Sequence, residues 1–335
     1  MIEARFKATP QDFRVDEVLG FEPSGGGEHA YLHIEKTGWN SNDVSSHIAE
    51  RLDIRKRLIS HCGVKDRDAV TRQWFSVHLP GQPSPDPESL ETEGIRILEI
   101  TRGTRKLRRG SHDGNRFEVT LRDVALHKSA SRANVEARWQ AIASGGVPNY
   151  FGPQRFGKSG DNPEQARRLF RGETEIRDRL VRGLIISSAR SLLFNAVVAK
   201  RIADGLWGRI MDGDVFGFPD NRSLILPDRL RGDESERLES GQIELTAPLW
   251  GAGELLSTGA AREWESLPAD PELAEGLESV GMRQERRVIR LRPVNAEFEW
   301  LDQDDPSGSS AIRLRFSLPS GCYATEIVRE LASLM

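Results

Sequence analysis

The residues best able to do chemistry lie between positions 61 and 79, where a short charged run precedes a strand-like segment. In this run Lys65 and Arg67 flank Asp66, and Asp68 follows. Nearby positive charge favours the ionised form of a carboxylate, so Asp66 would be ready at neutral pH as a nucleophile or general base. The same charges would also suit a solvated turn between two elements, and this segment alone leaves both interpretations open.

Asp66 and Asp68 also fit the D-x-D-x-[TV] loop of haloacid-dehalogenase-type phosphatases. There the first Asp is phosphorylated and the second protonates the leaving group beside a magnesium ion, for which Asp214 and Asp220 could form an acidic loop. That chemistry needs an Asp at the carboxyl end of a buried parallel strand. Residues 60–65 are too polar and too short for one, so the magnesium-dependent phosphatase is kept as the alternative function.

A second resemblance extends over nearly the whole chain. Residues 63–71, G-V-K-D-R-D-A-V-T, resemble the signature G-x-K-D-[RK]-x-A-x-T of the TruD family of pseudouridine synthases. Four further segments match that family in its order: residues 10–17 (P-Q-D-F-R-V-D-E), 114–117 (G-N-R-F), 148–157 (P-N-Y-F-G-P-Q-R-F-G) and 323–331 (Y-A-T to R-E-L). Asp68 departs from the family pattern, where His or another polar residue is expected, without affecting the central function.

This resemblance implies an enzyme and a set of site residues. It implies a tRNA pseudouridine synthase that isomerises uridine 13 in the D arm of tRNA, without cofactor or metal. Asp66 would be the catalytic residue, attacking C1′ or removing a ribose proton. Phe13, Phe117 and Tyr323 would line the nucleoside pocket, and Asn115 would hydrogen-bond the substrate. A catalytically inert RNA-binding relative is a further alternative, against which the intact Asp66 argues.

The overall charge does not by itself indicate a nucleic-acid-binding protein. The chain has 335 residues and a net charge of −4, so cations that grip RNA phosphates must be concentrated locally. Residues 102–109 hold the densest group. We expect a flexible basic arm here, in which Arg105, Lys106, Arg108 and Arg109 contact the RNA backbone; an exposed hairpin without RNA contacts is the alternative.

The composition also indicates which compartment and which cofactors to expect. Two cysteines, Cys62 and Cys322, cannot form a disulfide framework and fit a reducing cytoplasm. His29 and His33 have the spacing of helical zinc ligands, but a strand would separate them by ~13 Å, so no metal is expected. We expect neither a signal peptide nor a membrane-spanning segment, because no apolar run reaches the length needed for one. The expected protein is a cytoplasmic monomer that binds tRNA, with no membrane and no obligatory protein partner.

The elements that must position these residues follow from periodicity. A cap at Asn40 or Ser41 predicts a helix, and alternation predicts strands at 74–79, 95–100 and 117–121. Helices are predicted at 132–144, from 162, and at 175–203, with a loop at 246–253, and alternation returns between 289 and 316. Together with the resemblance, this predicts an α/β (mixed α+β) chain. A pseudouridine-synthase-like catalytic domain with a mixed, largely antiparallel sheet (1–145 and 292–335) would be interrupted by an inserted TRUD domain (146–291).

Overall fold

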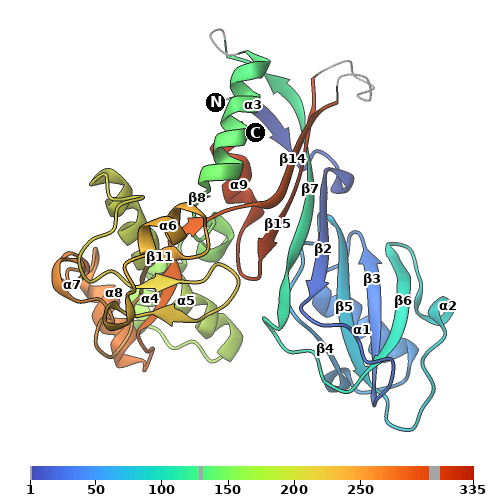
Figure 1. Cartoon of the computed structure of the whole chain (residues 1–335). Coiled ribbons are helices and arrows are strands. Elements are labelled where there is room, and N and C mark those ends of the chain that lie inside the picture. Colours follow the sequence, from blue (N-terminus) through green and yellow to red (C-terminus); the bar gives the residue numbers. More distant parts are fainter. Residues whose placement is uncertain (1, 128–130, 302–309) are drawn as a thin grey trace. The chain divides into compact units, whose positions relative to one another are not determined.

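A ten-stranded mixed sheet built from both ends of the chain is the largest element of the computed structural model (Figure 1). The structure describes residues 2–127, 131–301 and 310–335. The strands of this sheet are β1 (Ile2–Phe6), β2 (Phe13–Leu19), β3 (His29–Lys36), β4 (Ile59–His61), β5 (Val70–His78), β6 (Ile95–Gly103), β7 (His112–Ala125), β14 (Val294–Trp300), β15 (Ile312–Pro319) and β16 (Ala332–Leu334). The central path runs β14-β15-β7-β2-β5-β3-β6, and β1, β16 and β4 pair beside it. β1 with β16 and β2 with β5 are parallel, and the pairs along the rest of the path are antiparallel.

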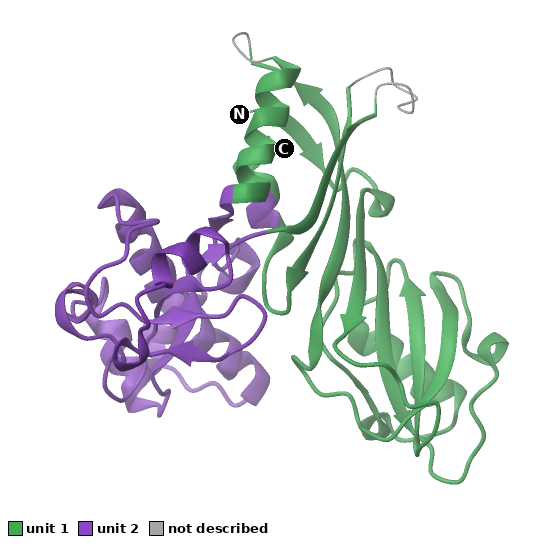
Figure 2. Cartoon of the chain, viewed as in Figure 1, with its two compact units in different colours: residues 1–144, 293–324, 328–335 green, residues 145–292, 325–327 purple. Residues whose placement is uncertain are grey.

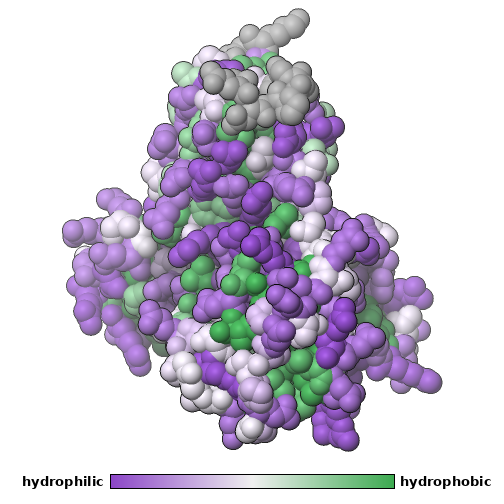
Figure 3. All heavy atoms as spheres, turned by 90° about the vertical axis from the view of Figure 1, so that its right-hand side faces the viewer, coloured by the Kyte–Doolittle hydropathy of each residue, from purple (hydrophilic) through white to green (hydrophobic). Residues whose placement is uncertain are grey.

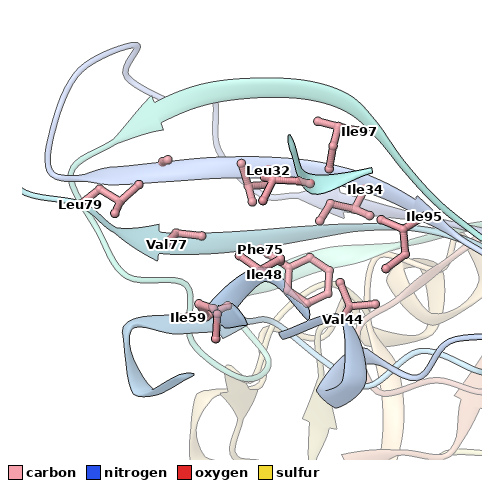
Figure 4. Packing of buried hydrophobic residues seen from close by; sticks show 13 residues of the cluster. Leu32, Ile34, Val44, Ile48, Ile59, Phe75, Val77, Leu79, Ile95 and Ile97 are labelled. Carbon is pink, nitrogen blue, oxygen red and sulfur yellow. The ribbon is translucent and has the colours of Figure 1, made fainter. Parts of the chain in front are cut away.

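Helix α1 (Ser41–Arg51) covers one end of this sheet and begins where the sequence predicts. The Asn40 side chain accepts hydrogen bonds from the backbone N–H groups of Asn42 and Asp43, which satisfies two of the unpaired donors of the first turn. Val44 and Ile48 of the helix are fully buried in one cluster with strand residues such as Phe75 (Figure 4). The helix therefore fixes the outer strands as one layer.

Helix α3 (Arg132–Gly145) supplies the second cover. Its Trp139 is fully buried, with ring centroids 6.3 Å from Phe298 and 6.1 Å from Phe316. The remaining helices of this part are the short α2 (Pro87–Leu90), α9 (Ala324–Leu331) and the 3-10 turns η1 (Pro10–Asp12) and η2 (Lys56–Leu58).

The chain forms two compact units (Figure 2). Unit 1 contains residues 1–144, 293–324 and 328–335, and unit 2 contains residues 145–292 and 325–327. Unit 1 thus holds the large sheet, and unit 2 is formed by the middle of the chain together with three residues of α9.

Unit 2 is a smaller mixture of helices and short strands. Its elements are β8 (Val147–Pro148), η3 (Pro153–Phe156), α4 (Asn162–Phe170), α5 (Arg179–Ala203), β9 (Phe216–Gly217), β10 (Leu224–Ile225), η4 (Pro227–Arg229), α6 (Glu234–Glu239), β11 (Glu244–Leu249), α7 (Gly259–Glu265), α8 (Pro271–Ser279), β12 (Glu285–Val288) and β13 (Arg290–Leu291). Its four-stranded sheet has the order β10-β9-β11-β12. Apolar residues of α4, α5 and α8 share one buried cluster.

Two expectations for this region are wrong. The predicted loop at 246–253 begins with strand residues, because β11 pairs with β12 from Thr246 to Leu249. A proline has no backbone N–H and so cannot donate a hydrogen bond to a neighbouring strand. Pro248 is tolerated in β11 because β9 pairs only with Glu244 and Leu245, so no strand on that side needs a donor at Pro248. The second expectation is that no apolar run is long enough to span a bilayer. Helix α5, however, is long and apolar enough to cross a membrane by length and composition. Half of that apolar window is buried inside the protein, as in the core helix of a globular fold.

The face of the molecule that Figure 3 draws is mostly polar. In the space-filling view hydrophilic residues predominate, and apolar residues form only small separate patches (Figure 3). Scattered apolar residues of this kind are normal on protein surfaces and indicate no docking face by themselves.

Candidate active site

Strand register places most of the predicted site on one face of the large sheet. Residues directly opposite each other in a ladder point to the same face, and so do residues two apart on one strand. One row across the sheet runs Phe316, Phe117, Val15, Thr71, Lys36. The neighbouring rows on that face are Leu314, Val119, Phe13 and Leu318, Asn115, Glu17. Phe13, Asn115 and Phe117 are therefore brought together by pairing, although the first is about a hundred residues from the others.

Asp66 lies in the loop between β4 and β5, and its carboxylate is held from two sides. The Lys7 ammonium forms an ion pair with Oδ2, and Oδ1 accepts a hydrogen bond from the Asp68 N–H at 3.0 Å. The Asp66 side chain keeps 38% of its surface exposed. The carboxylate is thus fixed in orientation and still open to a substrate.

The environment of Asp66 favours its charged form. Partial burial acts to raise its pKa, but the hydrogen bond and charge of Lys7, the Asp68 N–H and the charge of Lys36 outweigh it, and the net shift is downward. Asp66 is consequently ionised at neutral pH.

The cations beside this carboxylate are not those that the sequence suggests. Lys65 points into a buried network, and Arg67 donates from Nε to the Gly38 carbonyl at 3.0 Å. The partner is Lys7, 59 residues earlier in the chain, with a left-handed backbone at φ +54°. A residue other than glycine in this conformation is uncommon and often marks a functional position.

Lys36 anchors the loop that carries Asp66 through two hydrogen bonds. It is 1% exposed, and its Nζ donates to the Asp66 carbonyl at 2.8 Å and to the Trp39 carbonyl at 2.7 Å. Burial, helped by the charge of Lys65 and opposed by Asp66, lowers the pKa of Lys36 to about 8. A neutral amine can still donate both bonds, so the loop stays anchored as this group titrates.

A second buried network orients Asn115. The Lys65 ammonium lies 2.8 Å from Glu17 Oε2 and also donates to Asn115 Oδ1, while the Trp74 N–H donates to Glu17 Oε1 at 3.1 Å. Burial raises the pKa of Glu17, although Lys65 and the Trp74 N–H oppose that shift. Because an ammonium can only donate, the Asn115 oxygen must face Lys65 and its NH₂ group must face the other way.

The rings of Phe13, Phe117 and Phe316, here called the aromatic wall, lie beside these polar groups. The ring centroids of Phe13 and Phe117 are 6.1 Å apart, and those of Phe117 and Phe316 are 5.5 Å apart and stacked. The Lys7 Nζ lies 4.3 Å from the Phe13 centroid, so one ammonium touches both the aromatic wall and Asp66. These contacts connect Asp66, Phe13 and Phe117 in one place.

Tyr323 is placed less directly. Its side chain is half-buried, and it is the residue that precedes α9. Tyr323 follows Pro319 by four residues, and Pro319 pairs with Gly114 at the end of β15. Four residues span at most ~14 Å, so Tyr323 lies within that reach of the strand end that carries Asn115. Its assignment to the nucleoside pocket stays a prediction.

The basic segment between β6 and β7 is anchored, so the expectation of a flexible arm is wrong. Leu107 is 2% exposed and packs in a cluster with Tyr31, Cys62 and Trp74. The backbone is held as well: the Leu107 N–H donates to Ser76 Oγ at 3.0 Å, and the Gly110 N–H donates to the Cys62 carbonyl at 2.7 Å. A single apolar residue among the cations thus fixes this loop to the sheet.

The phosphatase alternative finds no support in the geometry. Asp66 follows β4, a three-residue strand that pairs antiparallel with β5, instead of a buried parallel strand. Both oxygens of Asp214 accept hydrogen bonds from Arg201, at 2.9 and 2.7 Å, in a buried pair. In the part of the chain that the structure describes, no group of three or more His, Cys, Asp or Glu side chains could hold a metal ion.

Several residues of the site were not assigned a role from the sequence. Glu17 closes the matched segment 10–17, and Lys7 lies three residues before it, but neither position by itself indicates a partner. Lys36 shows no signal beyond being a lysine at a strand end. Strand pairing makes all three part of the site.

An ionised carboxylate beside paired aromatic rings and an oriented amide is suited to chemistry on a nucleoside. The fold and the site therefore indicate the class of nucleoside-modifying enzymes. The family model described as tRNA pseudouridine synthase D (TruD) matches residues 1–176 and 169–331. The chain therefore belongs to the TruD family.

Individual relatives agree with this assignment. The tRNA pseudouridine synthase D of Methylococcus capsulatus is 44% identical over 329 residues, which cover 98% of this chain and 90% of that protein. That of Pseudomonas aeruginosa is 40% identical over 338 residues, covering 99% and 91%. The crystal structure of a putative tRNA pseudouridine synthase D from Methanosarcina mazei aligns with a TM-score of 0.71 at 21% identity, covering 98% of this chain and 93% of that one. This last likeness concerns the fold.

Proposed function

We propose that this chain is a tRNA pseudouridine synthase that isomerises uridine 13 in the D arm of tRNA, with Asp66 as the catalytic residue. The observation that carries the proposal is the Asp66 carboxylate, ionised by Lys7 and exposed beside Phe13 and Phe117. The reaction breaks the N1–C1′ bond, turns the uracil and joins C5 to C1′, so the C5 hydrogen leaves as a proton. Asp66 either attacks C1′ or removes a ribose proton, and in both routes a carboxylate is the group required.

The other side chains would hold the extruded nucleoside. A base taken out of its stack needs an aromatic face and a hydrogen-bonding edge, for which Phe13, Phe117, Tyr323 and Asn115 are the candidates. The Lys7 ammonium now lies over the Phe13 ring, so a base that stacks on this ring would take its place. The Asn115 NH₂ group, turned away from Lys65, would donate to a uracil carbonyl.

We further propose roles for the two parts of the chain and for its setting. Residues 1–145 and 292–335 would form the catalytic domain, and residues 146–291 the inserted TRUD domain that adds RNA contacts. Arg105, Lys106, Arg108 and Arg109 would contact the RNA backbone from an anchored loop. The protein would act in the cytoplasm as a monomer, with tRNA as its partner.

Asn115→Asp is expected to lower kcat/KM by ~10²-fold or more. A carboxylate cannot donate to the uracil carbonyl, and a site built to hydrogen-bond its substrate loses heavily when that bond is unmade. The measurement is pseudouridine formation in a tRNA transcript under single-turnover conditions. Asn115→Gln is the matched control, because it keeps the NH₂ group. An Asp variant that is as active as wild type would rule out the amide as a donor.

Activity is expected to survive chelation, which separates this function from the phosphatase. The test uses tRNA refolded before EDTA is added, because RNA folding itself requires magnesium. Release of tritium from 5-labelled uridine in the tRNA should continue at the untreated rate. Loss of this release, together with magnesium-dependent hydrolysis of an aryl phosphate, would favour the phosphatase instead.

A further inference from the structure

A strongly basic hollow lies close to the loop that carries Asp66, outside the proposed nucleoside pocket. It has a volume of about 600 Å³ and is bordered by η2 on one side and by the anchored basic loop on the other. Its charged lining consists of Lys56, Arg57, Lys106, Arg108 and Arg109, and none of its lining residues is Asp or Glu. Five cations without a carboxylate form an unusual group in a chain of net charge −4.

The arginines of this hollow differ from the buried, paired arginines of the chain. Arg201 and Arg286, for example, are buried against Asp214 and Glu265, at 2.7 and 2.6 Å. By contrast, the side chains of Arg57, Arg108 and Arg109 make no hydrogen bond or ion pair with any residue that the structure describes. Their five-donor guanidinium groups are therefore available to a ligand.

Other observations support a persistent positive field. His61 is buried at the hollow, and burial, together with the charges of Arg109, Lys65 and Lys56, lowers its pKa, against a hydrogen bond to Gly63. Lys106 and Arg57 are tied across the hollow, because Lys106 Nζ donates to the Arg57 carbonyl at 3.3 Å. Since Leu107 fixes the loop, an anion would meet cations on an already ordered backbone, which lowers the entropic cost of binding.

Two residues that line the hollow are close in the chain to residues of the loop that carries Asp66 or to a hydrogen-bond partner of that loop. His61 precedes Asp66 by five residues, a span of at most ~18 Å. Asn42, which also lines the hollow, follows Ser41, whose Oγ accepts a hydrogen bond from the Lys65 N–H at 2.9 Å. A ligand seated there would lie near the nucleotide at Asp66.

We propose that this hollow binds a backbone phosphodiester of the RNA strand that carries the target uridine, with Arg57 and Arg109 as its principal contacts. The inference rests on the proposed function for the identity of the RNA. Arginine forks match phosphate oxygens, and such contacts fix the register of a nucleic acid without reading its sequence. Lys56 and Arg57 of η2 thereby join the basic loop in one site.

The test compares two doubly substituted proteins with the same change in charge. Arg57→Gln/Arg109→Gln removes two cations from the hollow, and Arg51→Gln/Arg96→Gln removes two exposed cations that do not line it. Affinity for an unmodified tRNA transcript is measured over a salt series, with thermal melting as a check on folding. The hollow variant should bind ~10-fold or more weakly and lose ~0.7–0.9 units of salt slope per phosphate contact.

The outcomes separate this proposal from the proposed function. If wild-type protein releases tritium from labelled tRNA and the hollow variant binds with wild-type affinity and slope, the hollow is no phosphate site. An equal loss in the control variant would overturn it as well, because the effect would then be one of total charge. If wild type releases no tritium while only the hollow variant loses salt-dependent binding, the proposed function fails and the phosphate site stands.

Discussion

Replacing Asp66 with asparagine is expected to abolish pseudouridine formation while tRNA affinity stays within a few-fold of wild type. The substitution is nearly isosteric, but an amide can neither attack C1′ nor take a ribose proton, so the rate should fall by at least ~10³-fold. Binding should persist because phosphate contacts and stacking supply most of the affinity. Rate under single-turnover conditions and affinity for the same transcript are the two measurements.

Asp68→Asn is the matched control for this change. Asp68 serves Asp66 through its backbone N–H, which the substitution keeps. The variant should therefore retain substantial activity. An equal loss in both variants would point to a two-carboxylate mechanism, and a large loss of tRNA binding in the Asp66 variant would make its role structural.

Replacing Glu17 with alanine is expected to lower the free energy of unfolding by ~3–5 kcal/mol. The Glu17 side chain is fully buried, and that of Lys65 is 7% exposed. Removing the carboxylate leaves the ammonium buried without its counter-charge and the Trp74 N–H without its acceptor. Denaturant unfolding of the purified variant gives the value.

Two further variants show whether the cost comes from the unpaired charge. Glu299→Ala breaks surface ion pairs with Arg313 and Arg315 in which Glu299 is half-exposed, and it should cost less than ~1 kcal/mol. Adding Lys65→Met to Glu17→Ala should recover part of the lost stability, since the buried charge disappears. A single Glu17 variant as stable as the Glu299 variant would contradict this interpretation of the network.

The sequence predicts best those features that depend only on residues close together in the chain. Asn40 caps α1 as expected because a cap is a local arrangement of one side chain and the next two N–H groups. Phe117 lies on the expected strand because its alternation with Val119 is visible in the sequence alone. Asp66 could be singled out because its surrounding motif is contiguous.

Features that depend on partners distant in the chain could not be predicted in this way. The charges next to Asp66 in the sequence suggest Lys65 and Arg67 as the cations that favour its ionised form. In the fold, Lys7 contacts the Asp66 carboxylate and Lys36 contacts the Asp66 carbonyl instead. The cations of the basic loop suggested flexibility, because the effect of Leu107 depends on a core contributed by other strands. Pro248 suggested a loop, because the position where β9 stops pairing cannot be read from residues 246–253.

Tritium release shows most directly whether this chain isomerises one uridine through Asp66, as we propose. A tRNA transcript labelled at C5 of uridine is incubated with the protein, because joining C5 to C1′ expels the label into water. We expect release that matches the pseudouridine formed at position 13, no release by the Asp66→Asn protein, and no release when cytidine replaces uridine 13. The proposed function would be wrong if wild-type protein released no tritium from the unmodified transcript. The proposed role of Asp66 would be wrong if the Asp66→Asn protein released tritium at the wild-type rate.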